Sequence, residues 1–140
     1  MTDPVETTLY QRLGGEPAVR RLTRRFYELM DTLPEAAACR RVHRNGLQLP
    51  EQKLTEYLTG WFGGPQLYIE KYGQPMLRRR HFVAPIGGEE VSGWLICFRR
   101  AVAETVPDDL ATIFMPKIEA LAKHMQNRAD DSDDTETQLN

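Results

Sequence analysis

The sequence is poor in the features that mark secreted, disulfide-rich and membrane proteins. It has two cysteines among its 140 residues, Cys39 and Cys97, and they form no CxxC pair. Each lies in an apolar helical pattern, so we expect two buried free thiols rather than a disulfide framework. No apolar run approaches the roughly 20 residues that span a bilayer, and the N-terminus lacks a signal-peptide pattern. These absences favour a cytoplasmic protein with no membrane segment.

An excess of one charge is also missing. The chain has 18 Lys and Arg against 20 Asp and Glu, a formal net charge of −2, so we expect no attraction of the whole protein to nucleic acid. Its length fits one domain. The last stretch, "RADDSDDTETQLN", is acidic and has no hydrophobic periodicity, which is typical of a disordered tail. We therefore predict an N-terminal extension at 1–7, a folded domain at 8–127 and a tail at 128–140.

The hydrophobic periodicity inside the domain is helical, and no convincing alternating strand pattern is present. We predict a short helix around Leu9–Leu13 and long helices over 15–34, 50–62, 87–102 and 107–125. The second long helix is expected to stop at the Gly-Gly-Pro run that begins at Gly63. Pro116 is expected to kink or locally open the last one. The predicted fold class is all-α.

Two long connections rich in glycine and proline, 65–74 and 80–87, are unusual in so small a domain, and such loops are often functional. Tryptophans and tyrosines on the inward faces of the helices need partners for their polar tips. Both features suggest a cavity that holds a ligand. The second connection begins within "RRRH", which has two interpretations: a basic patch, or a histidine at a pocket edge with cations beside it for an anionic ligand.

Several segments occur in a characteristic order along the chain: "YQRLGG", "RFYELM", "GWFGGPQLYIEKYGQPMLRRRHF", "GWLICFRRAV" and "IFMPKIEALAKHM". In this order and spacing the sequence resembles the truncated haemoglobins, specifically their second group, from Leu9 to Met125. The resemblance implies a two-over-two helical sandwich around haem b, the iron of which binds O2 and other diatomic ligands.

On the proximal side, the resemblance implies that His81 is the iron ligand. A neutral imidazole is a good iron donor when its other ring nitrogen is oriented by an acceptor. The two haem propionates suit guanidinium groups, which pair with carboxylates through two hydrogen bonds. The resemblance implies propionate contacts from Arg78 and Arg80, and also from Lys53 and Tyr68. For Lys53, a solvated surface position is the alternative.

On the distal side, the resemblance points to Tyr27, His43, Leu54 and Trp94. Donors from Tyr27 and Trp94 would stabilise the partial negative charge of bound dioxygen. Pro50 stands where a globin's distal histidine is expected, so that role passes to other residues. His43 has three alternatives: a hydrogen bond with Tyr27, donation to the ligand, or coordination of ferric iron. Plain core packing is the alternative for Tyr27 and Trp94.

The function expected from these residues is that of an oxygen-binding globin with redox use on oxygen, nitric oxide or peroxide. Either turnover, nitric oxide dioxygenation or peroxidase-like chemistry, needs a reductase partner, and the sequence leaves enzyme status open. Two other functions remain as alternatives. One is a haem-based sensor or carrier, and the other is a cofactor-free helical adaptor that uses the basic loop as a partner patch.

Overall fold

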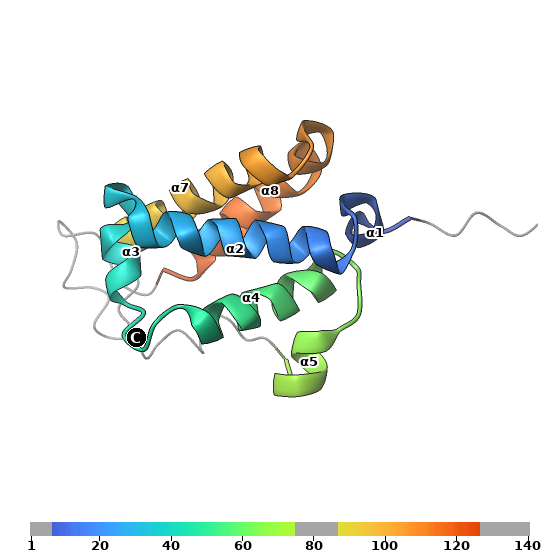
Figure 1. The fold of residues 1–140 in the computed structure, drawn as a ribbon, viewed down its shortest axis with the longest axis horizontal. Coiled ribbons are helices and arrows are strands. Elements are labelled where there is room, and N and C mark those ends of the chain that lie inside the picture. Colours follow the sequence, from blue (N-terminus) through green and yellow to red (C-terminus); the bar gives the residue numbers. More distant parts are fainter. Residues whose placement is uncertain (1–6, 75–86, 127–140) are drawn as a thin grey trace, which may run out of the picture.

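The computed structural model describes residues 7–74 and 87–126, and every regular element within these two ranges is a helix (Figure 1). In chain order the elements are α1 (Leu9–Leu13), α2 (Glu16–Thr32), the 3₁₀ helix η1 (Pro34–Ala36), α3 (Ala37–Arg41), α4 (Gln48–Trp61), α5 (Leu67–Tyr72), α7 (Gly88–Thr105) and α8 (Asp108–His124). The predicted all-α class is confirmed. None of the described helices is long and apolar enough to cross a membrane.

The ends of the helices follow local chemistry. Pro17 lies in the first turn of α2, where a backbone N–H would have no partner within the helix, so the N–H that proline lacks costs no helical hydrogen bond. Helix α4 stops near the predicted breaker, since Gly63 adopts a φ of +98°, a left-handed conformation that favours glycine. Pro116 lies inside α8, which continues on both sides of it from Asp108 to His124.

Two parts of the predicted outline were wrong. The connection at 65–74 was expected to be a loop, but it contains the six-residue helix α5. The short elements η1 and α3 were not predicted at all. All three are too short to display a hydrophobic period, so sequence patterns have little to detect. Helix α4 also starts earlier than expected, at Gln48, which places Pro50 in its first turn.

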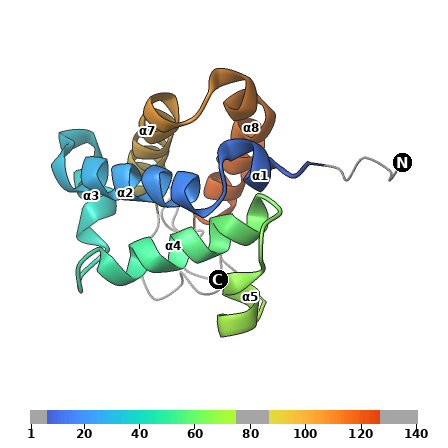
Figure 2. The same cartoon turned by 45° about the vertical axis from the view of Figure 1, so that its right-hand side comes forward.

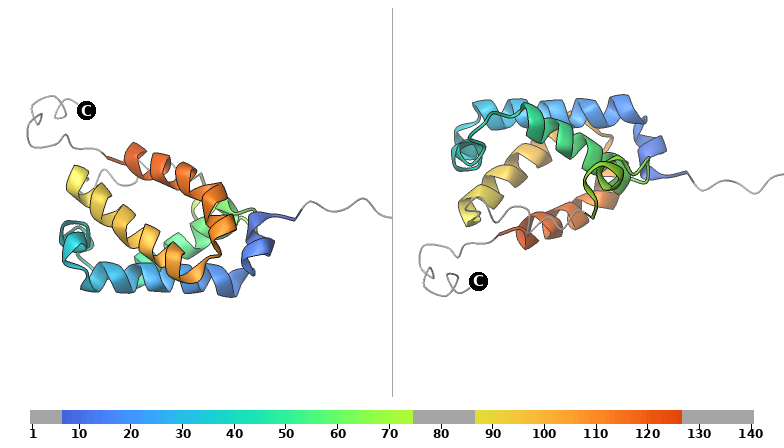
Figure 3. Two further views of the ribbon diagram at one scale, coloured as in Figure 1. Left: turned by 90° about the horizontal axis from the view of Figure 1, so that it is seen from above. Right: turned by 90° about the horizontal axis from the view of Figure 1, so that it is seen from below.

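The helices form two crossing pairs. Helix α2 packs on α4, helix α7 packs on α8, and the two pairs meet through an extensive contact between α2 and α7. Figure 2 shows α4 and α7 on opposite sides of α2, and Figure 3 shows α7 and α8 running obliquely to α2. This is the two-over-two helical sandwich that the resemblance implied.

The core lies where the two pairs meet. Its largest fully buried side chains include Phe26, Phe98 and Phe114, each at most 1% exposed. Burying one such side chain stabilises the fold by about 1.5–3 kcal/mol. Cys39 and Cys97 belong to the same core and are both free, which confirms the prediction of buried thiols. Burial raises the pKa of the Cys39 thiol to about 12 and that of Cys97 to about 11.

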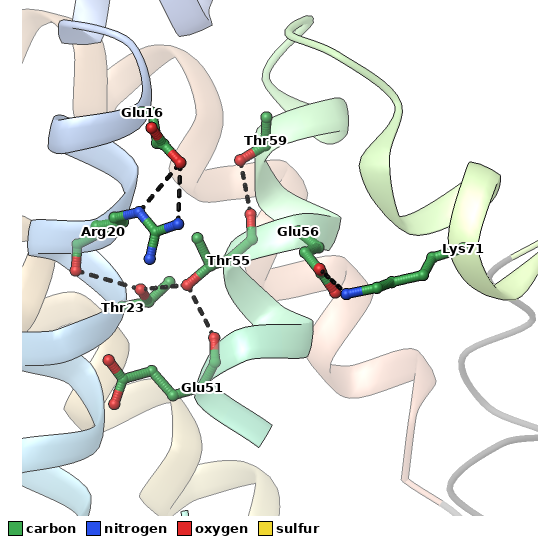
Figure 4. A network of polar contacts seen from close by, with 8 residues as sticks. All are labelled: Glu16, Arg20, Thr23, Glu51, Thr55, Glu56, Thr59 and Lys71. Atoms are coloured by element: carbon green, nitrogen blue, oxygen red, sulfur yellow. Dashed lines mark hydrogen bonds and ion pairs between the residues drawn. The ribbon is translucent and has the colours of Figure 1, made fainter. Parts of the chain in front are cut away.

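A buried hydroxyl pair fixes α2 against α4 (Figure 4). The oxygens of Thr23 and Thr55 are 2.7 Å apart, and the Thr55 hydroxyl is also 2.8 Å from the carbonyl of Glu51. The Thr23 hydroxyl also contacts a carbonyl, that of Arg20, but at the longer distance of 3.3 Å. The shorter distances favour donation from Thr55 to Glu51 and from Thr23 to Thr55. Thr59 repeats the pattern on the carbonyl of Thr55 at 2.7 Å. These bonds satisfy polar groups that burial would otherwise leave unpaired.

Candidate functional site

An aromatic cluster joins α2 to α7. The ring of Phe26 lies 4.7 Å from that of Tyr27 and 5.0 Å from that of Trp94, both in edge-to-face contact. The Trp94 ring stacks on Phe98 with centroids 4.9 Å apart and planes 7° from parallel. Such contacts fix ring orientation as well as burying area. The structure therefore brings together Tyr27 and Trp94, two distal residues predicted from the sequence.

Tyr27 is placed as a hydrogen-bond donor. Its side chain is 6% exposed, and burial raises the pKa of its phenol well above the ordinary value, with smaller contributions from Cys39 and Glu51. The phenol is therefore protonated at neutral pH. Within residues 7–74 and 87–126, no side chain hydrogen-bonds this hydroxyl. Among the described residues, the one fully buried side-chain polar atom without a partner is Glu56 Oε1, so the Tyr27 oxygen itself is partly accessible. A donor in this state suits a ligand that brings the acceptor.

The orientation of His43 fixes which nitrogen carries its proton. Its Nδ1 is 3.0 Å from the carbonyl oxygen of Cys39, which can only accept, so Nδ1 donates. In the neutral ring Nε2 is then an acceptor, and its ring lies edge-to-face with Tyr27 at 6.1 Å. Of the three alternatives for His43, donation to a ligand therefore requires the protonated ring. Acceptance from Tyr27 and metal coordination suit the neutral one.

The guanidinium group of Arg40 holds the segment around His43 in place. Arg40 donates to the carbonyl of His43 at 3.0 Å and to the carboxylate of Asp31 at 2.9 Å. The guanidinium group thus links the end of α2 to the turn that follows α3. This support was not predicted, because it depends on a tertiary contact between segments with no shared periodicity.

Helix α4 supplies apolar side chains that are only partly covered. We call the set of partly buried side chains packed against the core from α4 and α7 the apolar wall: Leu54, Tyr57, Trp61 and Trp94. Large apolar side chains in a small domain normally gain by complete burial. A partly covered group of them is typical of a binding site for an apolar molecule. Leu54 and Trp94 both pack against the core as partly buried side chains, and their place on the distal side of a haem stays a prediction.

Lys53 and Tyr68 are both close to a residue that sequence reasoning missed, Tyr72. The Nζ atom of Lys53 is 5.1 Å from the centre of the Tyr72 ring, and the Tyr68 ring is 4.8 Å from it. Lys53 is exposed, whereas Tyr68 is 8% exposed and also contacts Tyr57 at 5.8 Å. The signal for Tyr72 was its spacing of four residues from Tyr68, which places both on one face of α5.

The remaining predicted site residues, Arg78, Arg80 and His81, lie outside the described residues. Among residues 7–74 and 87–126, no group of three or more His, Cys, Asp or Glu side chains is arranged to hold a metal ion.

A separate groove of about 840 Å³ lies between α2 and α4. Its lining includes three arginines and three glutamates: Arg20, Arg21, Arg24, Glu16, Glu51 and Glu56. The α4 residues that line it include Thr55 and Thr59 but not Leu54. Figure 4 shows the ion pair between Glu16 and Arg20 in this region. A charged and balanced lining does not suit an apolar group, so this groove is distinct from the apolar wall.

The helical sandwich and the apolar wall agree with a family comparison. The model of the bacterial-like globin family matches residues 8–127. The chain belongs to the bacterial-like globins. The resemblance to the truncated haemoglobins of the second group is also confirmed, because similar proteins and similar structures are haemoglobins of that group.

Three relatives illustrate this similarity. A group II 2-on-2 haemoglobin of Agrobacterium tumefaciens is 55% identical, with a TM-score of 0.87 over 92% of this chain and 100% of that one. The group 2 truncated haemoglobin YjbI of Bacillus subtilis is 31% identical over 120 residues, 85% of this chain and 89% of the relative. A truncated oxygen-avid haemoglobin structure from Bacillus subtilis is 30% identical, with a TM-score of 0.78 over 86% of this chain and 100% of that one.

Membership of the globins implies a haem, and the described residues of this globin fit such a group. The apolar wall suits the flat faces of a porphyrin. The exposed ammonium of Lys53, beside the tyrosines of α5, suits a carboxylate of the propionate kind. The globin is therefore a haem protein by family, with a described surface whose chemistry agrees.

Proposed function

We propose that this globin holds haem b through His81 and binds O2 and other diatomic ligands on the side of Tyr27 and Trp94. The observation that carries the proposal is the protonated Tyr27 hydroxyl, which has no hydrogen-bonding side chain among the described residues and belongs to a ring that contacts Phe26, as the ring of Trp94 does. The printed description of a Bacillus subtilis relative as oxygen-avid supports it.

Each distal residue has a separate task in this proposal. Haem iron, when bound, supplies the coordination position for the diatomic ligand. Tyr27 and the indole N–H of Trp94 donate to a ligand that carries partial negative charge; the side chain of Tyr27 is buried and that of Trp94 is partly buried. Leu54 keeps the pocket apolar. His43 holds the Tyr27 ring through an edge-to-face contact, and the single phenolic proton of Tyr27 is left for the ligand.

The propionates are assigned to cationic and phenolic partners. Arg78 and Arg80 shortly precede the proposed iron ligand in sequence, and Lys53 and Tyr68 lie on α4 and α5. Guanidinium groups hold a carboxylate through two hydrogen bonds, whereas the lysine acts as a point charge. We expect the arginines to contribute more to haem retention than Lys53, which is exposed.

Strong donation to the ligand favours retention of oxygen over its rapid delivery, so redox use on nitric oxide or peroxide is the physiological role we propose. Either reaction consumes electrons, so a reductase partner is part of this proposal. A sensor or carrier role remains the alternative. A cofactor-free adaptor is disfavoured, because the chain belongs to the globins. The cytoplasmic location stays a prediction.

The test of the proposed ligand is a pair of histidine variants. His81→Ala should lose haem during purification, with a strongly weakened Soret band. His124→Ala is the matched control, because His124 is an exposed residue at the end of α8. Equal haem content and an unchanged spectrum in both variants would remove His81 from the ligand role. A colourless, fully folded wild-type protein that binds no added haem would favour the adaptor.

A further inference from the structure

One glycine of α7 lies unusually close to the backbone of another element. A Cβ atom built on Gly93 would lie 3.1 Å from the Cα of Ala36 and 3.1 Å from the carbonyl oxygen of Glu35. It would also lie 3.4 Å from the Cβ of Cys39. The first two neighbours are backbone atoms, which cannot rotate away as a side chain does. An alanine at this position therefore has to push α7 away from η1 and α3 by a few tenths of an ångström.

The two elements that meet at Gly93 carry two walls of the proposed ligand site. Trp94 is the next residue of α7, and its ring is stacked on Phe98 of the same helix, so it moves with that helix. On the other element, the carbonyl of Cys39 holds the ring of His43. Arg40 ties this segment to Asp31. A displacement at Gly93 is thus transmitted to the distance between Trp94 and the α3 side of the site.

We propose that Gly93 is a positioning residue, which sets the indole of Trp94 at the distance from α3 that donation to the ligand requires. This inference rests on the proposed function, in which Trp94 is a donor. Hydrogen bonds weaken steeply once the donor and acceptor separate beyond about 3.2 Å. A shift of a few tenths of an ångström therefore removes much of the Trp94 contribution without removing the residue.

A second glycine provides a matched control. Gly60 precedes Trp61 in α4 just as Gly93 precedes Trp94 in α7. The atoms nearest to a Cβ on Gly60 all belong to the side chain of Gln66, the first at 2.9 Å. This exposed side chain can rotate away, at the cost of its hydrogen bonds to the carbonyls of Gly60 and Gly64. Both changes replace a helical glycine by alanine and gain similar helix propensity. They differ in whether the new methyl group meets backbone.

The kinetic test measures O2 dissociation at pH 8, where histidine side chains are ordinarily neutral. Gly93→Ala should speed dissociation roughly threefold to tenfold, and Gly60→Ala less than about twofold. In a Trp94→Phe background, Gly93→Ala should add less than about twofold, because the donor on which it acts is gone. Equal acceleration in both backgrounds, or none in the wild-type background, would overturn the role of Gly93.

A second measurement separates this inference from the proposed function. The chain has two tryptophans, so the diamagnetic carbon monoxide complex should give two indole N–H signals by NMR, assigned through Trp94→Phe. Gly93→Ala should shift the Trp94 signal more than Gly60→Ala does. If Trp94→Phe leaves O2 dissociation unchanged, the donor role fails, while this spectrum still tests the positioning. An unshifted Trp94 signal would refute Gly93 itself.

A variant of Ala36, the η1 residue that faces Gly93 across the contact, tests the proposal if Gly93→Ala does not fold. Ala36 is fully buried, and its Cα lies 3.1 Å from the Cβ built on Gly93, so Ala36→Ser enlarges the side chain carried by that contact atom. If Gly93→Ala does not fold, the serine variant should show the faster dissociation and the shifted Trp94 signal. A folded serine variant with wild-type values of both would contradict the proposal.

Discussion

Replacing Trp94 by phenylalanine isolates the indole N–H from the packing of the ring. Phenylalanine retains an aromatic surface for the stack on Phe98, in which the centroids lie 4.9 Å apart, and for the edge contact with Phe26 at 5.0 Å. What is lost is one donor. A net contribution of about 1–1.5 kcal/mol per hydrogen bond corresponds to about a five- to thirteenfold faster O2 dissociation, at 1.4 kcal/mol per factor of ten.

The partner variant, Tyr27→Phe, removes one hydroxyl and keeps the ring contact with Phe26 at 4.7 Å. The double variant should then dissociate about thirty- to a hundred-and-fortyfold faster if the donors act independently, and less if they share one acceptor atom. Stopped-flow displacement of O2 by carbon monoxide measures all four proteins. Thermal unfolding of each protein shows whether the fold is intact.

A clear result would refute this reasoning. If both single variants fold normally and change the dissociation rate by less than about twofold, Tyr27 and Trp94 are core residues and not donors. The same outcome would also remove the observation that carries the proposed function.

Three further results are expected. Thr55→Val should lower the free energy of unfolding by about 0.5–1.5 kcal/mol, since the buried Thr23 hydroxyl loses its 2.7 Å partner and keeps only the 3.3 Å contact with the carbonyl of Arg20; urea titration should show a smaller loss for Thr112→Val, on the exposed face of α8. Raising the pH from 8 to 10 should lower the free energy of unfolding by about 3 kcal/mol, because the thiols of Cys39 and Cys97 ionise near pH 9 when unfolded but near 12 and 11 when folded. A double alanine variant that retains the whole pH dependence would contradict this assignment. The ferric protein should show no phenolate absorption from Tyr27 up to pH 10, because burial keeps its phenol protonated. A phenolate band at neutral pH would show that Tyr27 is ionised and would contradict its role as a donor.

The long helices were predictable because each displays an apolar period over several turns. Helix α2 begins at Glu16 with Pro17 in its first turn, and α8 begins at the acidic pair that includes Asp108. The helices η1, α3 and α5 were missed, since each has at most six residues. They are stabilised by tertiary contacts and not by a local pattern.

The candidate site shows the same division. The identities of Tyr27, Leu54 and Trp94 followed from the family resemblance, and the structure brings them to one core. The proton position on His43 did not follow, because it depends on a carbonyl of the preceding turn. The role proposed for Gly93 could not be predicted either. From the sequence, a glycine within a helix is only a weak helix former, and its contact with the backbone of η1 is known only from the structure.

The most direct test of the account is the iron–imidazole stretching band in the resonance Raman spectrum of the ferrous, ligand-free protein. The account predicts that this band is present in the wild type, lost in His81→Gly, and restored when imidazole is added to that variant. A band that persists in His81→Gly without imidazole would show that another residue binds the iron, and would contradict the assignment on which the proposed function depends.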